Sequence, residues 1–576
     1  GGGGGGRIAI YATSTGTFNV SSPTVTQGAG GNSNSSVGSY VFIQHNAEGN
    51  DLNVKGNMNV DSNQTYRHVI FNPSSSLTID SGMTLNVNGS YIGSTSALST
   101  VNGTLNINND TSLTNFAAIT NNGTMNLPYI ASISSVTTFT NNGSTELSLP
   151  NLTTLSSIST LNNNSGKTIL FGTSSPVTIS GITTLLNNDG TLTFNSASTS
   201  LISIASWDND GTVNLSTSTN TTIAVNGTFT NDSTVNLKHW SNLTLSAATL
   251  TLGTTALNLP STTTLANITT LTNNTTINVS ATSSLTFSGI TTFTNSASGI
   301  LYLPNTQSMG TITTFTNNGA INNVTNLTIP YGTFNQNGTF ENASTMDLTV
   351  GNGTNNATFN LQNTSSTTSL TLNNLTIRNH ATTTHQANST SQPYAVNLNI
   401  TSDLTIEAGG AIDVSGKGFA GGNGANYGGT YYGGNGGSGG GAIKLVVGGT
   451  ATINGIVSAN GSTGGAGNGN GSTYTHGSGA NGSGTGYGTG GSHDSSGYGG
   501  GGGGYGGGGG TGNLGGAAGG ITYGSALQPL DSGSGGGGGG IYFFGGGGGG
   551  GSGGSIWIDA DTITGNATFR ANGGDG

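Results

Sequence analysis

The sequence has 576 residues, of which only 5% are charged, and its formal net charge is −11. Soluble domains carry about 25% charged residues, so Asn, Thr, Ser and Gly must supply most of the polarity of this chain. The nine Lys and Arg residues form no cluster, which argues against a surface that binds nucleic acid. With no Cys and only short apolar runs, the sequence predicts neither disulfides nor insertion into a membrane by a helix.

Residues 1–32 are predicted to form a glycine tract followed by a pair of strands. Gly1–Gly6 precede the alternating segment Arg7–Ala12, and Thr15–Phe18 would supply the second strand. Because the chain begins without Met, we expect either that processing has removed its beginning or that it is a piece of a longer protein. Residues 33–110 are predicted to be β-rich transition coils that lead into the repeats.

Residues 111–400 repeat one phrase at intervals of about 20–23 residues, a period typical of coil-type repeats. The phrase reads Thr-Thr-Phe-Thr-Asn-Asn-Gly at Thr137–Gly143 and again at Thr313–Gly319, with a looser copy at Thr183–Gly190. Apolar and polar residues alternate within each copy, which indicates strands with one buried face. We expect the Asn-Gly steps to supply the positive φ angles of tight turns.

Recurrence of one phrase at one period favours a parallel β-solenoid over a sandwich or a barrel. Leu, Ile, Val and Phe would point inward in each coil and stack on the next coil. Equivalent Asn and Thr residues are expected to form hydrogen-bonded ladders along the stack. The predicted fold class is therefore all-β, a β-solenoid (β-helix) followed by a glycine-rich module.

Residues 401–576 form the glycine-rich module, and a glycine tract followed by two short strands recurs within it. Gly439–Val447 resembles Gly553–Ala560, and the second strands end in Ala-Asn-Gly at Ala459–Gly461 and Ala571–Gly573. An extended threefold glycine helix makes no internal hydrogen bonds, so we expect such tracts to pack side by side and bond to one another. In composition and tract length this module resembles the polyglycine-II bundles of phage tail-fibre adhesins.

Aromatic residues are interspersed among the glycine tracts of this module. They are expected either to cover the edges of the bundle or to form a surface on which sugars stack. The candidate ligand-facing residues are Tyr427, Tyr431, Tyr432, Tyr487, Tyr498 and Tyr505.

Asn-x-Ser/Thr sequons recur along the chain, and glycans would lie on the outer face of the coils. The candidate glycosylation sites are Asn102, Asn122, Asn142, Asn151, Asn226, Asn242, Asn267, Asn337 and Asn388.

No catalytic residue is predicted, because the acidic residues of the repeats are scattered and form no clear pair. A carbohydrate-active β-helix enzyme therefore ranks last among the functional hypotheses. No cofactor is expected, and the one candidate for a bound ion is a calcium site at Asp559 and Asp561, which alternate along one strand.

The repeat style over about 300 residues resembles the β-helical repeats of filamentous-haemagglutinin-type adhesins and other large surface proteins. That resemblance implies an extracellular or cell-surface protein without enzymatic activity. The first hypothesis is a structural subunit of a fibre, sheath or filament whose partner is itself, head to tail or in tandem. The second is an adhesin that binds glycans or another cell through the aromatic glycine-rich module.

Overall fold

The structure is a computed structural model, and it divides into two compact units, Gly1–Ile290 and Thr291–Gly576. No helix within the described residues is long and apolar enough to cross a bilayer. The residues that the structure describes are 8–12, 40–46, 49–143, 146–172, 176–195, 198–215, 220–231, 235–236, 242–252, 257–259, 262–427, 430–431, 433–467, 478–492, 498–512, 517–541 and 545–576.

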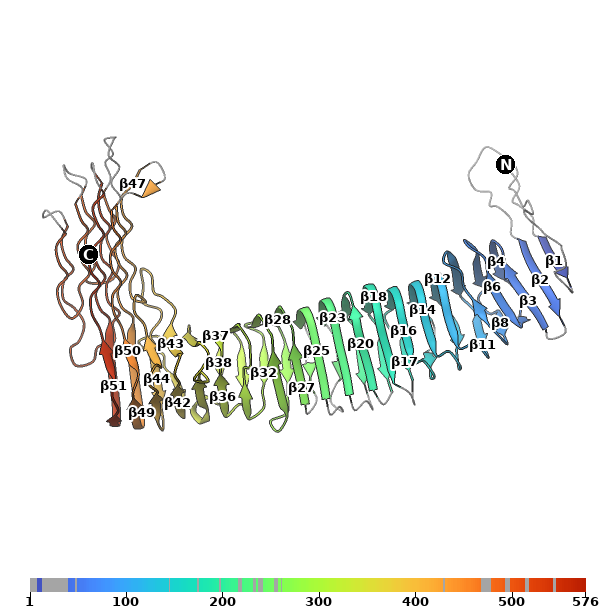
Figure 1. The fold of residues 1–576 in the computed structure, drawn as a ribbon, viewed down its shortest axis with the longest axis horizontal. Helices are drawn as coiled ribbons and strands as arrows, with labels where there is room; N and C mark the ends of the chain where they lie inside the picture. Colours follow the sequence, from blue (N-terminus) through green and yellow to red (C-terminus); the bar gives the residue numbers. More distant parts are fainter. Residues whose placement is uncertain are drawn as a thin grey trace. The chain divides into compact units, whose positions relative to one another are not determined.

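The first unit is a stack of β-coils whose strands pair with their equivalents in neighbouring coils (Figure 1). The strand pairs that the structure describes in this unit are parallel, except for the antiparallel pair of β2 and β3. One sheet has the order β1 (Ile8–Ala12), β2 (Tyr40–Asn46), β3 (Gly49–Val54), β6 (His68–Phe71) and β9 (Tyr91–Ile92). A second contains β5 (Gln64–Tyr66), β8 (Thr84–Val87), β11 (Thr104–Ile107) and β13 (Thr124–Asn126).

Two longer parallel sheets make up the rest of the first unit. The longest comprises β4 (Asn57–Val60), β7 (Ser76–Ile79), β10 (Ala97–Val101), β12 (Ser112–Asn121), β14 (Ser132–Asn141), β16 (Thr154–Asn163), β18 (Val177–Asn188), β20 (Ser198–Ile204), β21 (Trp207–Asn209), β23 (Asn220–Asn231), β25 (Asn242–Leu252), β27 (Thr262–Ala266), β28 (Thr270–Asn273) and β30 (Ser284–Ser288). The other comprises β15 (Leu147–Leu149), β17 (Thr168–Phe171), β19 (Thr191–Phe194), β22 (Thr212–Leu215), β24 (Val235–Asn236), β26 (Leu257–Asn258) and β29 (Thr276–Asn278).

The second unit is also a stack of parallel coils. One sheet holds β31 (Thr292–Asn295), β34 (Thr314–Asn317), β37 (Gly332–Gln336), β40 (Ala357–Leu361), β43 (Ala381–His385), β46 (Ala411–Asp413), β50 (Ile456–Ser458) and β52 (Thr568–Arg570). The strands β32 (Ile300–Tyr302), β35 (Ala320–Asn322) and β38 (Thr339–Phe340) pair in this order within another sheet. A third holds β33 (Thr306–Ser308), β36 (Asn326–Ile329), β39 (Asp347–Val350), β42 (Asn374–Ile377), β45 (Leu404–Ile406), β49 (Ala442–Ile453), β44 (Val396–Ile400), β41 (Leu370–Leu372) and β51 (Ser555–Thr564).

Two small elements complete the second unit, the antiparallel pair β47 (Asn426–Tyr427) and β48 (Thr430–Tyr431), and the 3-10 helix η1 (Ala343–Thr345). Residues Ala343–Thr345 are the only helical ones that the structure describes. The predicted all-β fold with a parallel β-solenoid is therefore confirmed. The predicted ranges 1–32, 33–110, 111–400 and 401–576 stay predictions.

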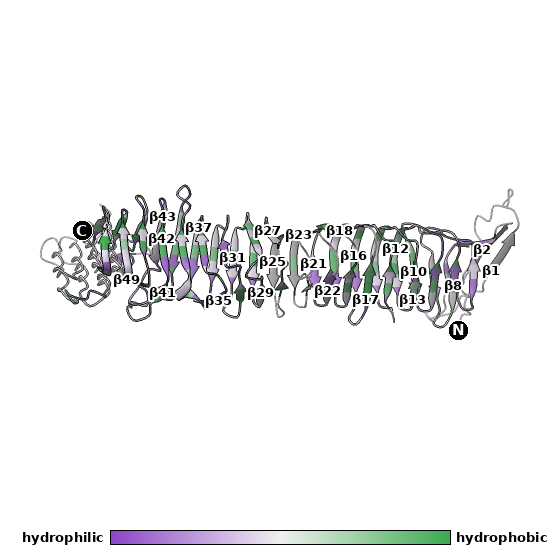
Figure 2. Cartoon of the chain, turned by 90° about the horizontal axis from the view of Figure 1, so that it is seen from below, coloured by the Kyte–Doolittle hydropathy of each residue, from purple (hydrophilic) through white to green (hydrophobic). Residues whose placement is uncertain are grey.

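The apolar core of each unit follows from the alternation seen in the sequence. Strands such as β7 and β19 alternate half-buried polar residues with buried apolar ones, and Figure 2 shows both kinds of residue along the strands. In the second unit Phe293, Phe315, Phe334 and Phe359 lie in one column, with successive ring centroids 4.8, 4.6 and 5.7 Å apart. These edge-on and tilted ring contacts bury large apolar areas and hold successive coils in register.

Asparagine side chains run through the interior as ladders, as the sequence predicts. In the first unit Asn121, Asn141, Asn163, Asn188 and Asn209 are fully buried at equivalent strand positions. Each Nδ2 donates to the Oδ1 of the next member, over 2.7–3.0 Å. Because a buried amide without partners is costly, the ladder fixes both the rotamer and the register of every coil that joins it.

The glycine of the repeated phrase has a different role from the one predicted. Gly143 and Gly319 do not have positive φ angles, so the expected left-handed turns at these Asn-Gly steps are wrong. A Cβ at Gly143 would overlap the carbonyl oxygen of Gly123, and one at Gly319 would overlap that of Gly299. Glycine is required because the backbones of successive coils approach closely, and not because of turn geometry.

The glycine-rich segments bond to one another with a period of three residues. In the segment 533–540, the N–H groups of Gly533, Gly536 and Gly539 donate to the segment 434–440 over 2.7–2.8 Å. The N–H groups of Gly535 and Gly538, which are also three residues apart, donate to the segment 480–483. Those of Gly537 and Gly540 donate to the segment 498–501. The backbone N–H groups of these segments, which belong to no β-sheet, therefore find their hydrogen-bond acceptors on neighbouring segments.

Candidate functional site

The strands β51 and β52 form the last coil of the second unit, and each is paired along one edge only. The strand β51 pairs in parallel with β49 (Figure 1). The strand β52 pairs in parallel with β50. In the described part of the chain no strand lies along their other edges. We call these two edges, with the side chains on them, the open edge.

The open edge exposes side chains that belong to interior columns of the solenoid. Ile563 continues a column whose members Leu327, Leu348, Leu375, Leu404 and Ala451 are at most 1% exposed, yet Ile563 itself is 54% exposed. Phe569 follows Ile412 and Val457, which are fully buried, and is 50% exposed. The last coil therefore has an inward face of the same composition as the others, without a coil to cover it.

The outward face of this coil carries the charged groups of the strand pair. The Nζ atom of Lys444 lies 4.7 Å from the ring centroid of Trp557, which faces it across the pair. Asp559 and Asp561 are both exposed, and no group of three or more His, Cys, Asp or Glu residues that could hold a metal is found among the described residues. Calcium binding at the two aspartates stays a prediction.

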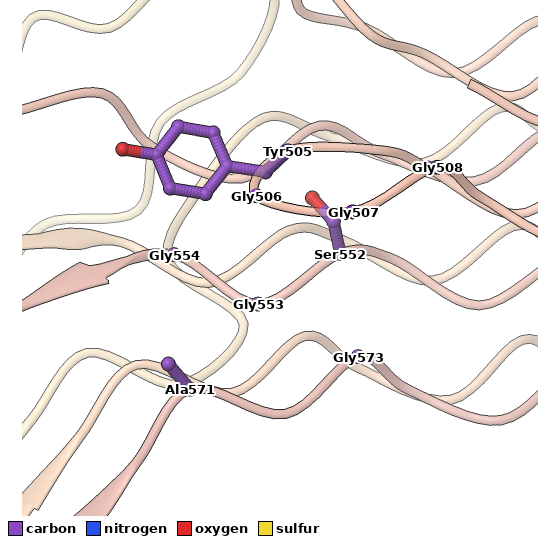
Figure 3. Close-up of a pocket in the computed structure, with 10 residues that line it drawn as sticks. Tyr505, Gly506, Gly507, Gly508, Ser552, Gly553, Gly554, Ala571 and Gly573 are labelled. Carbon is purple, nitrogen blue, oxygen red and sulfur yellow. The ribbon is translucent and has the colours of Figure 1, made fainter. Parts of the chain in front are cut away.

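A hollow of about 370 Å³ lies beside the start of β51, between glycine segments. It is lined by Tyr505 and the glycines after it, by Ser552–Gly554, and by Ala571 and Gly573 (Figure 3). The ring of Tyr505 is buried and meets that of Tyr523 edge-on, with centroids 5.0 Å apart. Burial raises the pKa of Tyr523 to about 12, and its hydroxyl donates to the carbonyl of Ser532 over 2.6 Å.

The structure does not place the candidate ligand-facing tyrosines on one surface. Tyr487 is exposed, Tyr498 is half-buried and Tyr505 is buried. Tyr427 and Tyr431 lie in β47 and β48, with side chains outside the description, and Tyr432 lies outside the described residues altogether.

The candidate glycosylation sites fall mostly on outer positions. Asn122, Asn142, Asn151, Asn267 and Asn337 are exposed.

Four sites differ from these. Asn102 is half-buried and starts an outer ladder, because its Oδ1 accepts from Asn122 over 2.9 Å. Asn388 is buried, and its Nδ2 donates to the carbonyl of Tyr394. Asn226 and Asn242 lie in β23 and β25, and their side chains are outside the description.

His385 is a buried titratable group where the coil stack meets the glycine segments. It occupies the position of the interior ladder that Asn317, Gln336 and Leu361 hold in the preceding coils. Its Nδ1 donates to the carbonyl of Gln386 over 2.6 Å, and no described group bonds to its Nε2. Burial, opposed by that hydrogen bond and reinforced by the charge of Lys417, lowers the pKa of His385 to about 4.

We expect the second unit to lose stability between about pH 6.5 and pH 4 because of His385. In this range the unfolded chain binds a proton at this imidazole that the folded chain does not bind, so the free energy of unfolding falls as the pH falls, by on the order of 3 kcal/mol. Urea unfolding at pH 7 and pH 4.5 measures the change, and His385→Leu, which places the residue found at position 361, should flatten it. A His380→Asn control at an exposed position should keep the wild-type dependence, and an unchanged slope in His385→Leu contradicts the assignment.

Sequence reasoning did not single out Ile563, Phe569 or His385. The alternation in Thr562-Ile563-Thr564 marks Ile563 as facing inward, but only the position of its coil in the stack makes it exposed. His385 breaks the pattern of the ladder, and it becomes visible as a ladder residue only when the register of β40 with β43 is known.

Comparisons with protein-family models, with curated proteins and with solved structures find no match to this chain. The open edge, the glycine-rich segments and the surface of the coils are the features of the chain that bear on its function.

Proposed function

We propose that this chain is a structural subunit of an extracellular fibre, sheath or cell-surface filament, and that it associates with itself head to tail or in tandem. The observation that supports this proposal best is the open edge. Half-exposed apolar side chains and unpaired backbone groups on the last coil favour the addition of another coil, as exposed strand edges do in general. The proposal gives the chain no catalytic role.

The strand β1 is the element that we propose to stack on the open edge. Its sequence, Ile8-Ala9-Ile10-Tyr11-Ala12, resembles Ile556-Trp557-Ile558-Asp559-Ala560 of β51, which in turn pairs with β49 so that Ile556 lies opposite Ile443. Among the strands that the structure describes, β1 also lies at the end of its own sheet, with β2 as its partner. A second copy could therefore add β1 to β51 in the register already used within the chain, with Ile8 opposite Ile556.

We further propose that the glycine-rich segments are threefold extended helices of the polyglycine-II type, which stiffen the filament. The segment 533–540 supports this, because its three residue phases donate to three different neighbours. Three more segments pack directly against this one. A Cβ atom added at Gly535, Gly536 or Gly537 would overlap the carbonyl oxygen of Ala420, Gly549 or Thr489, respectively. The segment 533–540 is thus surrounded by six neighbouring segments, as expected for hexagonal packing of helices with three residues per turn.

The alternative function, a glycan-binding surface made of the aromatic residues of the glycine-rich module, has less support. Tyr505 packs on Tyr523 within the module, and Tyr487 is the exposed tyrosine among the candidates whose side chains are described. A ring that is already buried within the module offers little face to a sugar.

Introducing charge at the open edge should block end-to-end association. In the variant Ile563→Lys with Phe569→Lys, each added coil would bury two ammonium groups, so we expect the wild-type filaments or oligomers to be replaced by single subunits. Electron microscopy and sedimentation velocity measure the assembly. The melting temperature should change little, because both side chains are already half exposed.

The matched control is Leu98→Lys. Leu98 is 44% exposed, but it lies on β10, whose two edges are paired with β7 and β12. This variant should assemble like the wild type. Wild-type chains that remain single, with both solenoid ends free at high protein concentration, would falsify the proposal.

A further inference from the structure

Three successive coils of the second unit form a hollow of about 530 Å³ around an exposed tyrosine. This volume lies within the range of small-molecule sites, which is about 300–1,000 Å³. We call it the Tyr331 hollow. It is lined by Gly310, Thr311 and Thr313 from one coil, Pro330 and Tyr331 from the next, and Asn352 and Asn355 from the third.

Tyr331 is unusual among the aromatic residues of these coils. Phe315 and Phe334, which lie on the neighbouring strands β34 and β37, are 1% exposed, whereas Tyr331 is 39% exposed. The ring is therefore not part of the aromatic column of the core. An exposed aromatic ring beside a hollow is a common feature of binding surfaces.

The backbone that carries Tyr331 is held in place on both sides. Pro330 has a restricted φ, and Gly332 has a φ of 70°, where a Cβ would overlap the carbonyl oxygens of Ile312 and Thr313. The N–H of Gly332 donates to the carbonyl of Asn356 over 3.1 Å. Because this corner is fixed in the free chain, binding would cost little ordering of the backbone that carries the ring.

The amide side of the hollow is also built by a constrained loop. Gly351 and Gly353 have φ angles of 91° and 83°, and the Oδ1 of Asn352 accepts the N–H groups of Thr354 and Asn355, both at 2.9 Å. Among the described residues no protein group bonds to the Nδ2 of Asn352 or to the side-chain amide of Asn355. These amides are available to a ligand.

We propose that the Tyr331 hollow is a binding site for a neutral saccharide. None of its lining residues is charged, so an ionic ligand would find no partner there. The C–H face of a sugar ring can stack on Tyr331 and Pro330, while its hydroxyl groups pair with the amides of Asn352 and Asn355. A purely apolar ligand would instead leave those amides unpaired and dehydrated.

The size of the hollow fits this class of ligand. Adjacent strands lie about 4.8 Å apart, so three coils span about 10 Å, enough for one or two sugar rings. The site does not involve the glycine-rich module or the open edge, and so it does not depend on self-association of the chain.

The test is binding of the full chain to an array of neutral oligosaccharides of glucose, galactose, mannose and N-acetylglucosamine, with heparin as the anionic comparison. Asn352-Gly353-Thr354 is itself a glycosylation sequon, so the chain is produced in a bacterial host that does not glycosylate it. We expect binding to a neutral oligosaccharide and none to heparin. The dissociation constant of the best array ligand is then measured by calorimetry.

Tyr331→Ala should raise this dissociation constant about tenfold or more, and Asn355→Ala should also weaken binding. The control is Tyr129→Ala, because Tyr129 also follows a proline at an exposed corner but lies in the first unit. It should bind like the wild type. The proposal is overturned if no neutral oligosaccharide binds, if heparin alone binds, or if Tyr331→Ala and Tyr129→Ala bind equally.

Discussion

Replacing Gly536 with alanine should disrupt the glycine-rich segments, lowering the free energy of unfolding of the second unit by about 3 kcal/mol. The N–H of Gly536 donates to the carbonyl of Gly437 over 2.8 Å, so a shift of the backbone at this residue would break that hydrogen bond. An alanine Cβ at this position would overlap the carbonyl oxygen of Gly549. Both neighbours are backbone, which cannot rotate aside as a side chain would.

The damage should spread beyond the substituted residue. Segment 533–540 donates to three neighbouring segments, so moving it by the width of a methyl group breaks hydrogen bonds on several sides. Each freed backbone group would be left buried without a partner. The N–H groups of Gly422 and Gly488 donate in turn to the carbonyls of Gly536 and Gly535. We therefore expect faster hydrogen exchange in peptides from 419–425 and 488–491 as well as in 533–540, measured by mass spectrometry.

Gly510→Ala is the matched control for this prediction. No atom lies within 4 Å of the place that its Cβ would take, and its φ is not positive. This substitution should be neutral or should stabilise the chain by about 0.4–1 kcal/mol, because alanine restricts the unfolded backbone. Equal effects of Gly536→Ala and Gly510→Ala would show that close packing of the segments is not what requires glycine.

The period of the sequence was sufficient to predict the solenoid and its ladders. Thr-Thr-Phe-Thr-Asn-Asn-Gly contains a core residue, an interior ladder residue and an outer ladder residue in a fixed order, as Phe315, Asn317 and Asn318 show. Each coil repeats the same local environment, so local pattern and tertiary packing coincide. That coincidence is why composition and spacing are informative in a repeat protein.

Close approach between coils could not be predicted in the same way. A glycine that follows Asn is typical both of a left-handed turn and of a backbone contact, and sequence alone does not distinguish the two. At Gly143 and Gly319 the contact is the reason. Gly332 and Gly351 do have positive φ angles, but they lie at other corners of the coil.

The candidate sites were the least predictable feature because they depend on register between distant residues. Tyr331 and Asn355 are 24 positions apart, and the hollow between them requires the loop 351–356 to fold over the corner of an earlier coil. Ile563 and Phe569 resemble every other inward residue in the sequence. What distinguishes them is that no described strand covers their coil.

Replacing Asn163 with alanine should destabilise the first unit by about 3 kcal/mol. The Nδ2 of Asn163 donates to Asn188 over 2.9 Å and to the carbonyl of Thr191 over 3.1 Å, and its Oδ1 accepts from Asn141 over 2.9 Å. The residue is fully buried, so no water replaces these partners. The loss therefore includes the unpaired groups of two neighbouring coils as well as the cavity left by the amide.

Asn162 offers the comparison that separates the ladder from asparagine content alone. It precedes Asn163 on the same strand, is half-buried, and makes one long hydrogen bond of 3.4 Å to Thr140. Asn162→Ala should change the free energy of unfolding by no more than about 0.5 kcal/mol, measured by the shift of the denaturant midpoint. If both variants lose the same stability, the interior ladder does not hold the coils together, and the stacked apolar columns alone must do so.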